Sequence, residues 1–398
     1  AVPPRRPEMA GAGTGAAGRG VRTMRLGVDI REWEPGRRTG IGAFLEMFLR
    51  EAPRQRPGLE LLLYGNSATA LPPGEALPVR RLPEPFRLWF DQVSLVRGVR
   101  ADGAEVFLSP YYKMPLTCPC PGVITIHDLL FLEYPPTPRH ATVLYRLLFR
   151  VGAALMARRA AAILTDSEWS RREILRRFSL PADRVVVTPL GVSPRFRPVP
   201  PEHARPVAAR YGLEGDYVLY VGNFRPHKNV GGLLEAYAAL PAPLRSGVAL
   251  ALAGAPETGA APLRAWAAAR GLTQAVRFLG PVPDADLPAL YAGATLFCFP
   301  SLAEGFGLPP LEAMACGAPV LCSDAAALPE VVGEAASLVN TRRPEALAAA
   351  LEALLADGAT RARLRERGLA RAAAFTPARF AAGILAVLEQ VAAGRGIV

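Results

Sequence analysis

Two glutamates, Glu304 and Glu312, stand eight positions apart in the run Phe299-Pro-Ser-Leu-Ala-Glu-Gly-Phe-Gly-Leu-Pro-Pro-Leu-Glu312. The glycines and prolines between them oppose a continuous helix. We therefore expect a strand that ends near Ser301, a loop that carries Glu304, and a helix that the prolines begin and whose first turn holds Glu312. Gly305 and Gly307 leave the backbone bare, which would let its N–H groups approach an anionic or hydroxylated ligand. Either glutamate alone could be an ordinary loop or helix-end charge, but the whole run favours a binding site.

A second group of residues could bind an anion. In Val221-Gly-Asn-Phe-Arg-Pro-His-Lys-Asn229, Arg225 and Lys228 follow an expected strand and open an expected helix. Backbone N–H groups at a helix N-terminus favour anions, and two cations would complete a cradle for a diphosphate that gains charge as it leaves. Lys228 is one of two lysines in the chain, the other being Lys113.

Further polar residues lie at expected strand ends in the first half of the chain. Gly36-Arg-Arg-Thr-Gly-Ile-Gly42 joins a strand to a helix, but it lacks the spacing of a dinucleotide-binding loop and is a weak signal alone. His127 and Asp128 end another expected strand. A single His is more often a core residue than a functional one, and we expect Asp128 to orient the local backbone or His127. Ser167 is expected to be a helix N-cap.

These motifs together resemble those of one enzyme family. The segment from Glu304 to Glu312 is similar to the E-x7-E signature of retaining GT-B glycosyltransferases of family 4. The mannosyltransferase-B-like branch is the most similar, given Arg38-Thr-Gly-Ile-Gly42, Thr125-Ile-His-Asp-Leu129 and Tyr220-Val-Gly-Asn-Phe-Arg-Pro-His-Lys-Asn229. The resemblance extends from Met24 to about Phe375. It implies that Glu304 lies beside the transferred hexose and that Glu312 hydrogen-bonds the nucleotide ribose.

The resemblance implies two sets of site residues. The implied catalytic residues are Glu304, His127, Arg225 and Lys228. The implied donor-binding residues are Gly40, Ile41, Gly42, Asn223, Phe306, Gly307, Leu308 and Glu312. No metal ligand and no cofactor are implied, because the nucleotide-sugar is a co-substrate and the family lacks a D-x-D motif. The family often has Arg-Lys where this chain has His227-Lys228, so we assign the second cation to Arg225.

Short apolar runs alternate with longer amphipathic stretches, which is typical of βαβ units and parallel sheets. Strands are expected at 25–30, 59–65, 106–109, 123–128, 163–167 and 185–189, and again at 217–222, 248–254, 276–280, 296–301 and 319–323. The fold class is α/β, with two doubly wound Rossmann-like domains facing across a cleft. We expect a disordered leader at 1–23, an acceptor-side domain at 24–195, a Pro-rich linker at 196–215 and a nucleotide-sugar-binding domain at 216–375. The helix within 376–398 should return to the first domain, because its apolar stripe must be buried.

Composition and charge narrow the function classes. Of the 398 residues, 51% are hydrophobic and 20% are charged, which excludes disorder for most of the chain. No apolar run approaches the roughly 18 residues of a membrane span, and neither a signal peptide nor a cysteine framework is evident, so we expect a cytoplasmic protein. Residues 1–199 hold 29 basic and 18 acidic residues, whereas residues 200–398 hold 17 of each. The net charge of +11 thus lies in the first half, where it would attract an anionic partner.

The sequence therefore predicts a metal-independent, retaining hexosyltransferase. Our first choice is mannose transfer from GDP-mannose to a saccharide or lipid-linked saccharide acceptor in cell-surface polysaccharide or glycolipid synthesis. UDP-glucose, UDP-galactose and UDP-N-acetylglucosamine remain open as donors. A glycosidase could use the two glutamates but would leave Arg225 and Lys228 without a task, and no motif supports nucleic-acid binding.

Arginines cluster on two expected helices, at Arg139, Arg146, Arg150, Arg158 and Arg159, and at Arg171, Arg172, Arg176 and Arg177. Several basic groups together can hold a protein at an anionic leaflet, so we expect peripheral association with the inner face of the plasma membrane. The alternative is that these arginines are only solvated.

Overall fold

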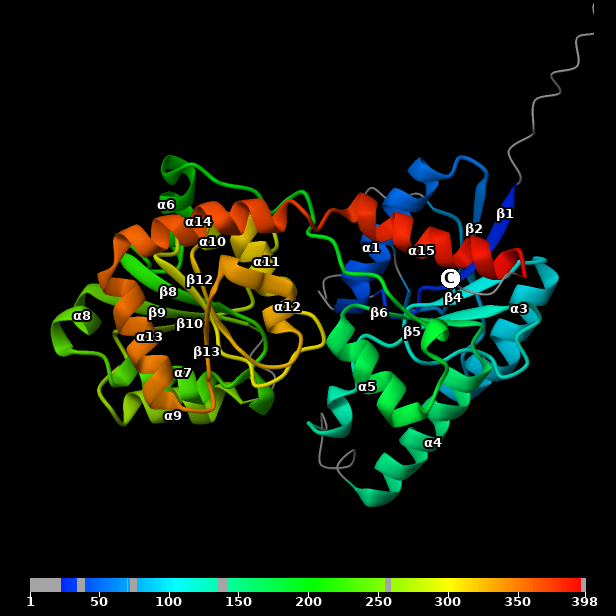
Figure 1. Cartoon of the computed structure of the whole chain (residues 1–398), viewed down its shortest axis with the longest axis horizontal. Coiled ribbons are helices and arrows are strands. Elements are labelled where there is room, and N and C mark those ends of the chain that lie inside the picture. Colours follow the sequence, from blue (N-terminus) through cyan, green and yellow to red (C-terminus); the bar gives the residue numbers. More distant parts are fainter. Residues whose placement is uncertain are drawn as a thin grey trace, which may run out of the picture.

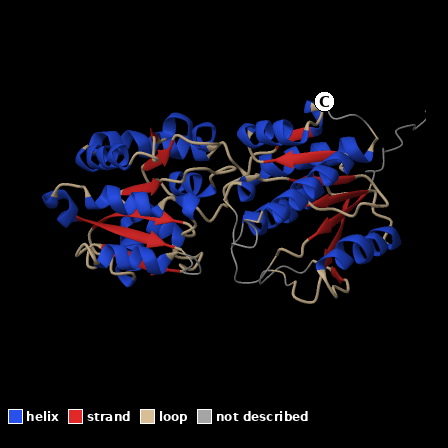
Figure 2. Ribbon diagram, turned by 90° about the horizontal axis from the view of Figure 1, so that it is seen from below, coloured by secondary structure: helices blue, strands red, loops and turns tan. Residues whose placement is uncertain are grey.

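The computed structural model describes residues 23–33, 40–69, 71, 77–134, 142–254 and 259–394. They form two α/β halves side by side, each built on a parallel sheet (Figure 1). Figure 2 shows the strands running through the middle of each half with helices on both sides. Because helices cover both faces, central strands such as β4 (Val106–Ser109), β5 (Gly122–Thr125) and β6 (Ala162–Thr165) are buried at every residue.

The first half contains a seven-stranded sheet in the order β3-β2-β1-β4-β5-β6-β7, with every pair parallel. Its strands are β1 (Met24–Asp29), β2 (Leu59–Gly65), β3 (Val79–Arg81), β4 (Val106–Ser109), β5 (Gly122–Thr125), β6 (Ala162–Thr165) and β7 (Val185–Val187). Its helices are α1 (Gly40–Gln55), α2 (Arg87–Trp89), η1 (Phe90–Ser94), α3 (Leu95–Ala101), η2 (Leu130–Leu132), α4 (Val143–Arg159), α5 (Glu168–Phe178) and η4 (Ala182–Arg184). Residues 36–39 of the expected glycine-rich turn lie outside the described residues.

The second half contains a six-stranded parallel sheet in the order β10-β9-β8-β11-β12-β13. Its strands are β8 (Asp216–Val221), β9 (Val248–Ala253), β10 (Val276–Gly280), β11 (Leu296–Phe299), β12 (Val320–Ser323) and β13 (Ser337–Val339). The helices are α6 (Pro201–Arg210), η5 (Pro226–Lys228), α7 (Val230–Ala238), α8 (Ala242–Gly247), α9 (Ala260–Ala268), α10 (Leu287–Gly293), α11 (Leu308–Ala315), α12 (Leu328–Val332), η6 (Gly333–Ala335), α13 (Pro344–Ala356) and α14 (Gly358–Ala372). Strand order reverses at β8, as it does at β1 in the first sheet, and ligands of such sheets bind beyond the carboxyl ends of the strands at this point.

The stretch expected to be a Pro-rich linker contains the helix α6. Pro201 stands in the first turn, where a missing N–H costs no hydrogen bond. Ala204 and Ala208 are buried, and α6 packs against α10. Part of this stretch therefore belongs to the packing of the second half.

The final helix, α15 (Pro377–Ala392), returns to the first half and packs along α1 (Figure 1). The rings of Phe380 and Phe44 lie 5.1 Å apart, and Gln55 Nε2 donates to the carbonyl oxygen of Ala378 at 2.9 Å. Arg56 forms an ion pair with Glu389. The predicted return of this helix is confirmed.

Residues 358–392 are, by length and composition alone, long and apolar enough to match a membrane span. Sequence analysis considered uninterrupted apolar runs, whereas this stretch is apolar only on average. In the structure this stretch comprises α14 and α15. The apolar residues of α15 are buried, at Phe380, Ile384, Leu385, Val387, Leu388 and Val391. Burial within the protein thus accounts for the apolar composition of α15.

Candidate active site

The loop that follows β11 lies at the boundary between the two halves. A Cβ atom added to Gly305 would lie 2.7 Å from the Cβ of Asp128 and 2.8 Å from the carbonyl oxygen of His127. Only glycine therefore allows this loop to lie against the end of β5. The predicted strand, loop and helix are all present, with β11 before Glu304 and α11 after it.

Glu304 and Lys228 form an ion pair in this loop. Lys228 Nζ lies 2.6 Å from Glu304 Oε1, and their side chains are 15% and 12% exposed. The ammonium group also lies 5.5 Å from the centre of the Phe299 ring. Sequence analysis assigned these two side chains to different parts of the donor, and the structure brings them into direct contact. An anion that approached Lys228 would therefore meet the Glu304 carboxylate on the same ammonium group.

The segment that carries Arg225 and Lys228 does not lead directly into helix α7, although the sequence predicted that it would. Pro226–Lys228 form a short 3-10 turn, and Asn229 has a left-handed backbone with φ of 54° before α7 begins. Arg225 is exposed, and its backbone N–H donates to Asn223 Oδ1 at 3.2 Å. Arg225 and Lys228 therefore precede the helix instead of lying in its first turn. Asn223 has a local structural role in addition to its predicted contact with the donor.

His227 stands where the family often has a cation. Its side chain is buried, its Nδ1 atom has no hydrogen-bond partner, and its ring lies 5.3 Å from that of Tyr134 in the first half. Burial, with the neighbouring Lys228 charge, lowers the pKa of His227 to about 4. At neutral pH this position is uncharged, so Arg225 and Lys228 supply the positive charge of the segment.

His127 is fixed through both ring nitrogens. Nδ1 lies 2.7 Å from Asp166 Oδ2, and Nε2 lies 3.0 Å from the carbonyl oxygen of Pro110. Both partners are acceptors, so the doubly protonated ring satisfies both. Burial alone would lower the pKa of His127, but the Asp166 carboxylate outweighs it and the pKa is raised. A ligand can reach a ring nitrogen of His127 only by displacing one of these partners.

The partner of His127 is Asp166, whereas the sequence suggested Asp128. Asp128 instead accepts the backbone N–H of Leu130 at 2.9 Å, which agrees with the predicted local backbone role. Burial raises the pKa of Asp128. Asp166 follows β6, the parallel neighbour of β5, so its proximity to His127 depends on strand order. The signal available in the sequence was an acidic residue at the end of the next strand.

Glu312 lies in α11, one turn later than predicted, since that helix has no acidic residue in its first turn. It is buried, and Tyr291 of α10 donates to its Oε2 atom at 3.2 Å. Pro309 and Pro310 have no N–H group, so Leu308 supplies the first free backbone donor of the helix.

Gly307, which precedes α11, has φ of 113°, a conformation that favours glycine. Phe306 is buried with its ring 5.9 Å from that of Phe375. The Phe306 side chain thus contributes to packing, and the backbone here is the part available for a donor.

Gly40, Ile41 and Gly42 begin α1, close after the end of β1 in the chain. They are exposed or half-buried, and a Cβ at Gly40 would meet no atom within 4 Å. Their predicted contact with a donor stays a prediction.

A buried polar cluster at the end of β1 was missed by sequence reasoning. Arg31 Nη2 lies 2.8 Å from Asp29 Oδ2 and 2.5 Å from Asp91 Oδ1, and it also contacts the hydroxyl of Tyr111. The Arg31 guanidinium lies 3.9 Å from the centre of the Phe90 ring. Burial raises the pKa of Asp91 even though Arg31 opposes this shift. The only signal in the sequence was the pair of Asp29 and Arg31 at the end of an expected strand.

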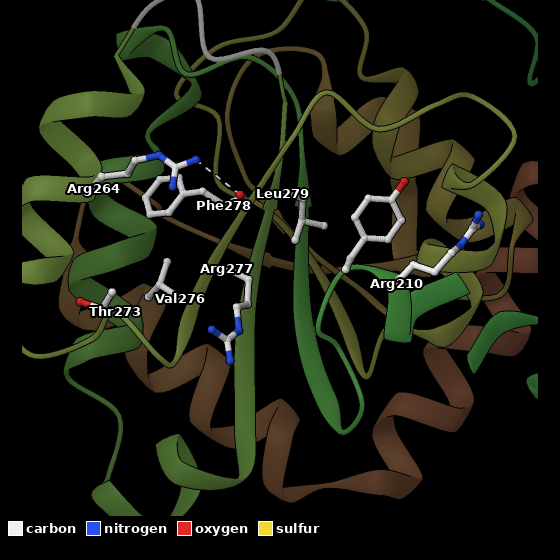
Figure 3. Close-up of a pocket in the computed structure, with 8 residues that line it drawn as sticks. Arg210, Arg264, Thr273, Val276, Arg277, Phe278 and Leu279 are labelled. Carbon is white, nitrogen blue, oxygen red and sulfur yellow. Dashed lines mark hydrogen bonds between the residues drawn. The ribbon is translucent and has the colours of Figure 1, made fainter. Parts of the chain in front are cut away.

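A shallow basic pocket lies elsewhere, along β10 (Figure 3). Its three arginines already have partners: Arg210 pairs with Asp286, Arg264 lies over the ring of Phe278, and Arg277 donates to Gln274 Oε1 at 3.4 Å. None of the predicted site residues lines this pocket. Within the described ranges, no three His, Cys, Asp or Glu side chains are placed to share a metal ion.

The structure has two parallel-sheet halves. The segment of Arg225 and Lys228 and the loop of Glu304 lie at the boundary between them. This arrangement is typical of the GT-B class of proteins. The sequence matches the profile described as Glycosyltransferase Family 4 over residues 41–196 and the profile described as Glycosyl transferases group 1 over residues 210–371. The chain belongs to this glycosyltransferase family, which confirms the resemblance seen in the motifs.

Individual relatives agree with the branch inferred from the sequence. The chain is 40% identical over 267 residues to O-antigen chain mannosyltransferase B of Escherichia coli, covering 64% of this chain and 66% of that enzyme. It is 35% identical over 223 residues to the Escherichia coli serotype-specific mannosyltransferase WbdA, covering 55% of this chain and 27% of that protein. The chain thus aligns with slightly less than two thirds of the first relative and about a quarter of the second.

A solved structure of Anabaena Alr3699/HepE in complex with UDP and glucose has a TM-score of 0.73 and 20% identity. The match covers 92% of this chain and 100% of that chain. At this identity the likeness shows the fold, which is the GT-B arrangement predicted from the sequence.

Proposed function

We propose that this protein is a retaining glycosyltransferase that moves a hexose from a nucleotide-sugar to a saccharide acceptor. The observation that carries the proposal is the Lys228–Glu304 pair, held at the boundary of the two halves. A diphosphate would take Lys228 as its partner, and Glu304 would then be released beside the hexose. Arg225 adds a second, exposed positive charge to the same segment.

The proposed reaction breaks the bond between the anomeric carbon and the diphosphate oxygen and forms a bond from that carbon to an acceptor oxygen on the same face. Lys228 and Arg225 stabilise the charge that develops on the leaving diphosphate. The leaving phosphate accepts the proton of the acceptor hydroxyl, so no side chain is needed as a base. Glu304 and His127 position the hexose, and Glu312 binds the ribose.

Our preferred donor is GDP-mannose, because two relatives are named as mannosyltransferases. A UDP-sugar is the second candidate, because the related fold of Alr3699/HepE was solved with UDP and glucose. Thermal-shift and calorimetric titrations with GDP and UDP distinguish the two. Stronger stabilisation by GDP supports the first donor, stronger stabilisation by UDP supports the second, and no response to either contradicts the transferase proposal.

We further propose that transfer needs no divalent metal and no cofactor, because two side-chain cations are available for the diphosphate. Added EDTA should leave nucleoside diphosphate release from the donor unchanged. Complete loss of activity with EDTA, restored by Mg²⁺ or Mn²⁺, would contradict this part of the proposal.

The proposed acceptor is lipid-linked, in the synthesis of a cell-surface polysaccharide or glycolipid, and the enzyme works on the inner face of the plasma membrane. The support is α4, on which Leu147, Val151 and Leu155 are 54%, 59% and 43% exposed. Their spacing of four residues places them on one face of the helix. Arg150, Arg158 and Arg159 on the same helix are also exposed, and each arginine near an anionic leaflet contributes about 1 kcal/mol.

The arginines of α5 give less support to the proposed membrane association. Arg176 pairs with Glu173, and Arg171 donates to the carbonyl oxygens of Ala182 and Val185. Arg139 lies outside the described residues, and the side chain of Arg146 is not described. The proposed membrane surface is therefore α4.

Co-sedimentation with anionic and with neutral vesicles, at low and at high salt, tests this surface. Leu147→Glu should reduce binding to anionic vesicles several-fold, because it adds a charge among the apolar residues. Leu338→Glu, at a similarly exposed leucine of the second half, is the matched control and should bind as the wild type. Equal, negligible binding to both kinds of vesicle would remove the membrane proposal and leave the transferase proposal intact.

A further inference from the structure

The second half is attached to the first at the N-terminus of α5. Ser167 Oγ and Ser170 Oγ both donate to the carbonyl oxygen of Gly305, at 2.6 Å and 3.1 Å. Both serines are 1% exposed. A carbonyl oxygen has two lone pairs, so these two hydroxyl groups satisfy Gly305 completely. The loop next to Glu304 is thus bonded to the opposite half of the molecule.

A second contact reinforces the first. The carboxylate of Glu330, in α12, accepts the backbone N–H groups of Glu168 and Trp169 at 2.8 Å and 3.1 Å. A negative charge at the start of a helix is favoured by the helix dipole and by the unpaired N–H groups there. Figure 1 shows α12 and α5 on the facing sides of the two halves. Two segments of the second half therefore dock on the same end of α5.

The serine contacts act on the peptide next to Glu304. The peptide carbonyl of Gly305 is held by the serines, and the carbonyl oxygen of Glu304 accepts the N–H of Ala327 at 3.3 Å, one residue before α12. The Glu304 side chain in turn holds Lys228. Any separation of the halves would leave the Gly305 carbonyl without these donors and release the loop.

We propose that Ser167 and Ser170 are positioning residues that set the Glu304 loop in its working position when the two halves meet. This inference rests on the proposed function, in which Glu304 lies beside the transferred hexose. Closure of the halves and placement of Glu304 then occur in one step. The serines touch neither donor nor acceptor and act through the Gly305 carbonyl.

The test measures nucleoside diphosphate release from GDP-mannose, or from UDP-glucose where GDP-mannose is no substrate, together with calorimetric GDP and UDP binding. The variant Ser167→Ala/Ser170→Ala should lower kcat about 10- to 100-fold, because a misplaced catalytic group costs this much. Nucleoside diphosphate affinity should not fall, because Lys228, Arg225 and Glu312 remain.

Two further variants separate positioning from helix capping, because Ser167 also accepts the N–H of Ser170 as the N-cap of α5. Ser167→Asp keeps a good N-cap but cannot donate to Gly305, so its kcat should fall as in the alanine variant. Ser170→Ala removes one donated bond and no cap. Asp357→Ala removes the N-cap of α14 and is the control for the loss of a cap. It should lower stability without changing kcat.

The outcomes distinguish the two proposals. If Glu304→Gln leaves kcat unchanged, the assigned role of Glu304 in the proposed function fails. If Glu304→Gln is impaired while the double serine variant and Ser167→Asp, both folded by circular dichroism, keep full kcat, the positioning role is overturned. If the double variant does not fold, Ser170→Ala decides: a lowered kcat without a loss of nucleotide affinity supports the role, and an unchanged kcat overturns it.

Discussion

The facing edges of the two halves both carry charged side chains at the ends of strands, but these side chains differ in their partners. In the first half, His127 is bonded to Asp166 and Pro110, and Arg31 is surrounded by Asp29, Asp91 and Tyr111. In the second half, Lys228 has Glu304 as its carboxylate partner, and that carboxylate is a proposed site residue itself.

His127 and Arg31 are therefore fixed by structural partners, whereas Lys228 is held by a proposed site residue that a ligand could replace. The His127 ring and the Arg31 guanidinium of the first edge already have partners, so they form a rigid surface against which a substrate could be placed. We propose that the Lys228–Glu304 pair on the second edge opens when a diphosphate binds. Donor binding should therefore rearrange the second half and leave the buried polar groups of the first half as they are.

The largest effect is expected from Lys228→Ala. This substitution should raise the activation free energy of transfer by roughly 2–4 kcal/mol, because a charge-assisted contact to the leaving diphosphate is lost. Lys113→Ala, which alters the other lysine of the chain, is the matched control and should bind nucleoside diphosphate as the wild type. Unchanged nucleotide affinity together with unchanged turnover in Lys228→Ala would contradict the proposed role of Lys228 in binding the diphosphate.

A smaller and more selective effect is expected from Glu312→Gln. A ribose contact exists both before and during transfer, so its loss should raise the KM for the donor about tenfold and change kcat less. Glu345→Gln, at the exposed start of α13, is the control. A fall in kcat with an unchanged KM would reverse the division of roles between Glu312 and Glu304.

The smallest effect on activity is expected in the first half, from Asp166→Asn. This variant removes the carboxylate partner of His127. The raised pKa of His127 means that this pair contributes stability at low pH and loses it as the pH rises through the pKa of the folded state. The variant should therefore lose about 1.5–3 kcal/mol of unfolding free energy below about pH 6.5, and less at higher pH. Denaturant unfolding from pH 5 to pH 9 measures this. A stability difference that grows with pH would contradict the assignment.

Local sequence signals predicted the parts of the site that depend on chain neighbours. The prolines and glycines around Glu304 predicted the strand, loop and helix, and the stripe on α15 predicted burial. The missed contacts join residues that are far apart in the sequence, such as Lys228 with Glu304 and Ser167 with Gly305. They depend on strand order and on how the two halves meet, which no local pattern contains. The same limit explains the choice of Asp128, the sequence neighbour, as the first partner considered for His127.

We propose that Glu304 and a donor diphosphate compete for Lys228, and the variant Glu304→Gln tests this competition. Removing the carboxylate charge frees Lys228 for the diphosphate while removing a group that positions the hexose. Calorimetry of Glu304→Gln with the preferred nucleoside diphosphate should show an affinity about three- to tenfold higher than that of the wild type, and the same variant should turn over more slowly. A nucleoside diphosphate affinity that is unchanged or lower in Glu304→Gln would contradict the account.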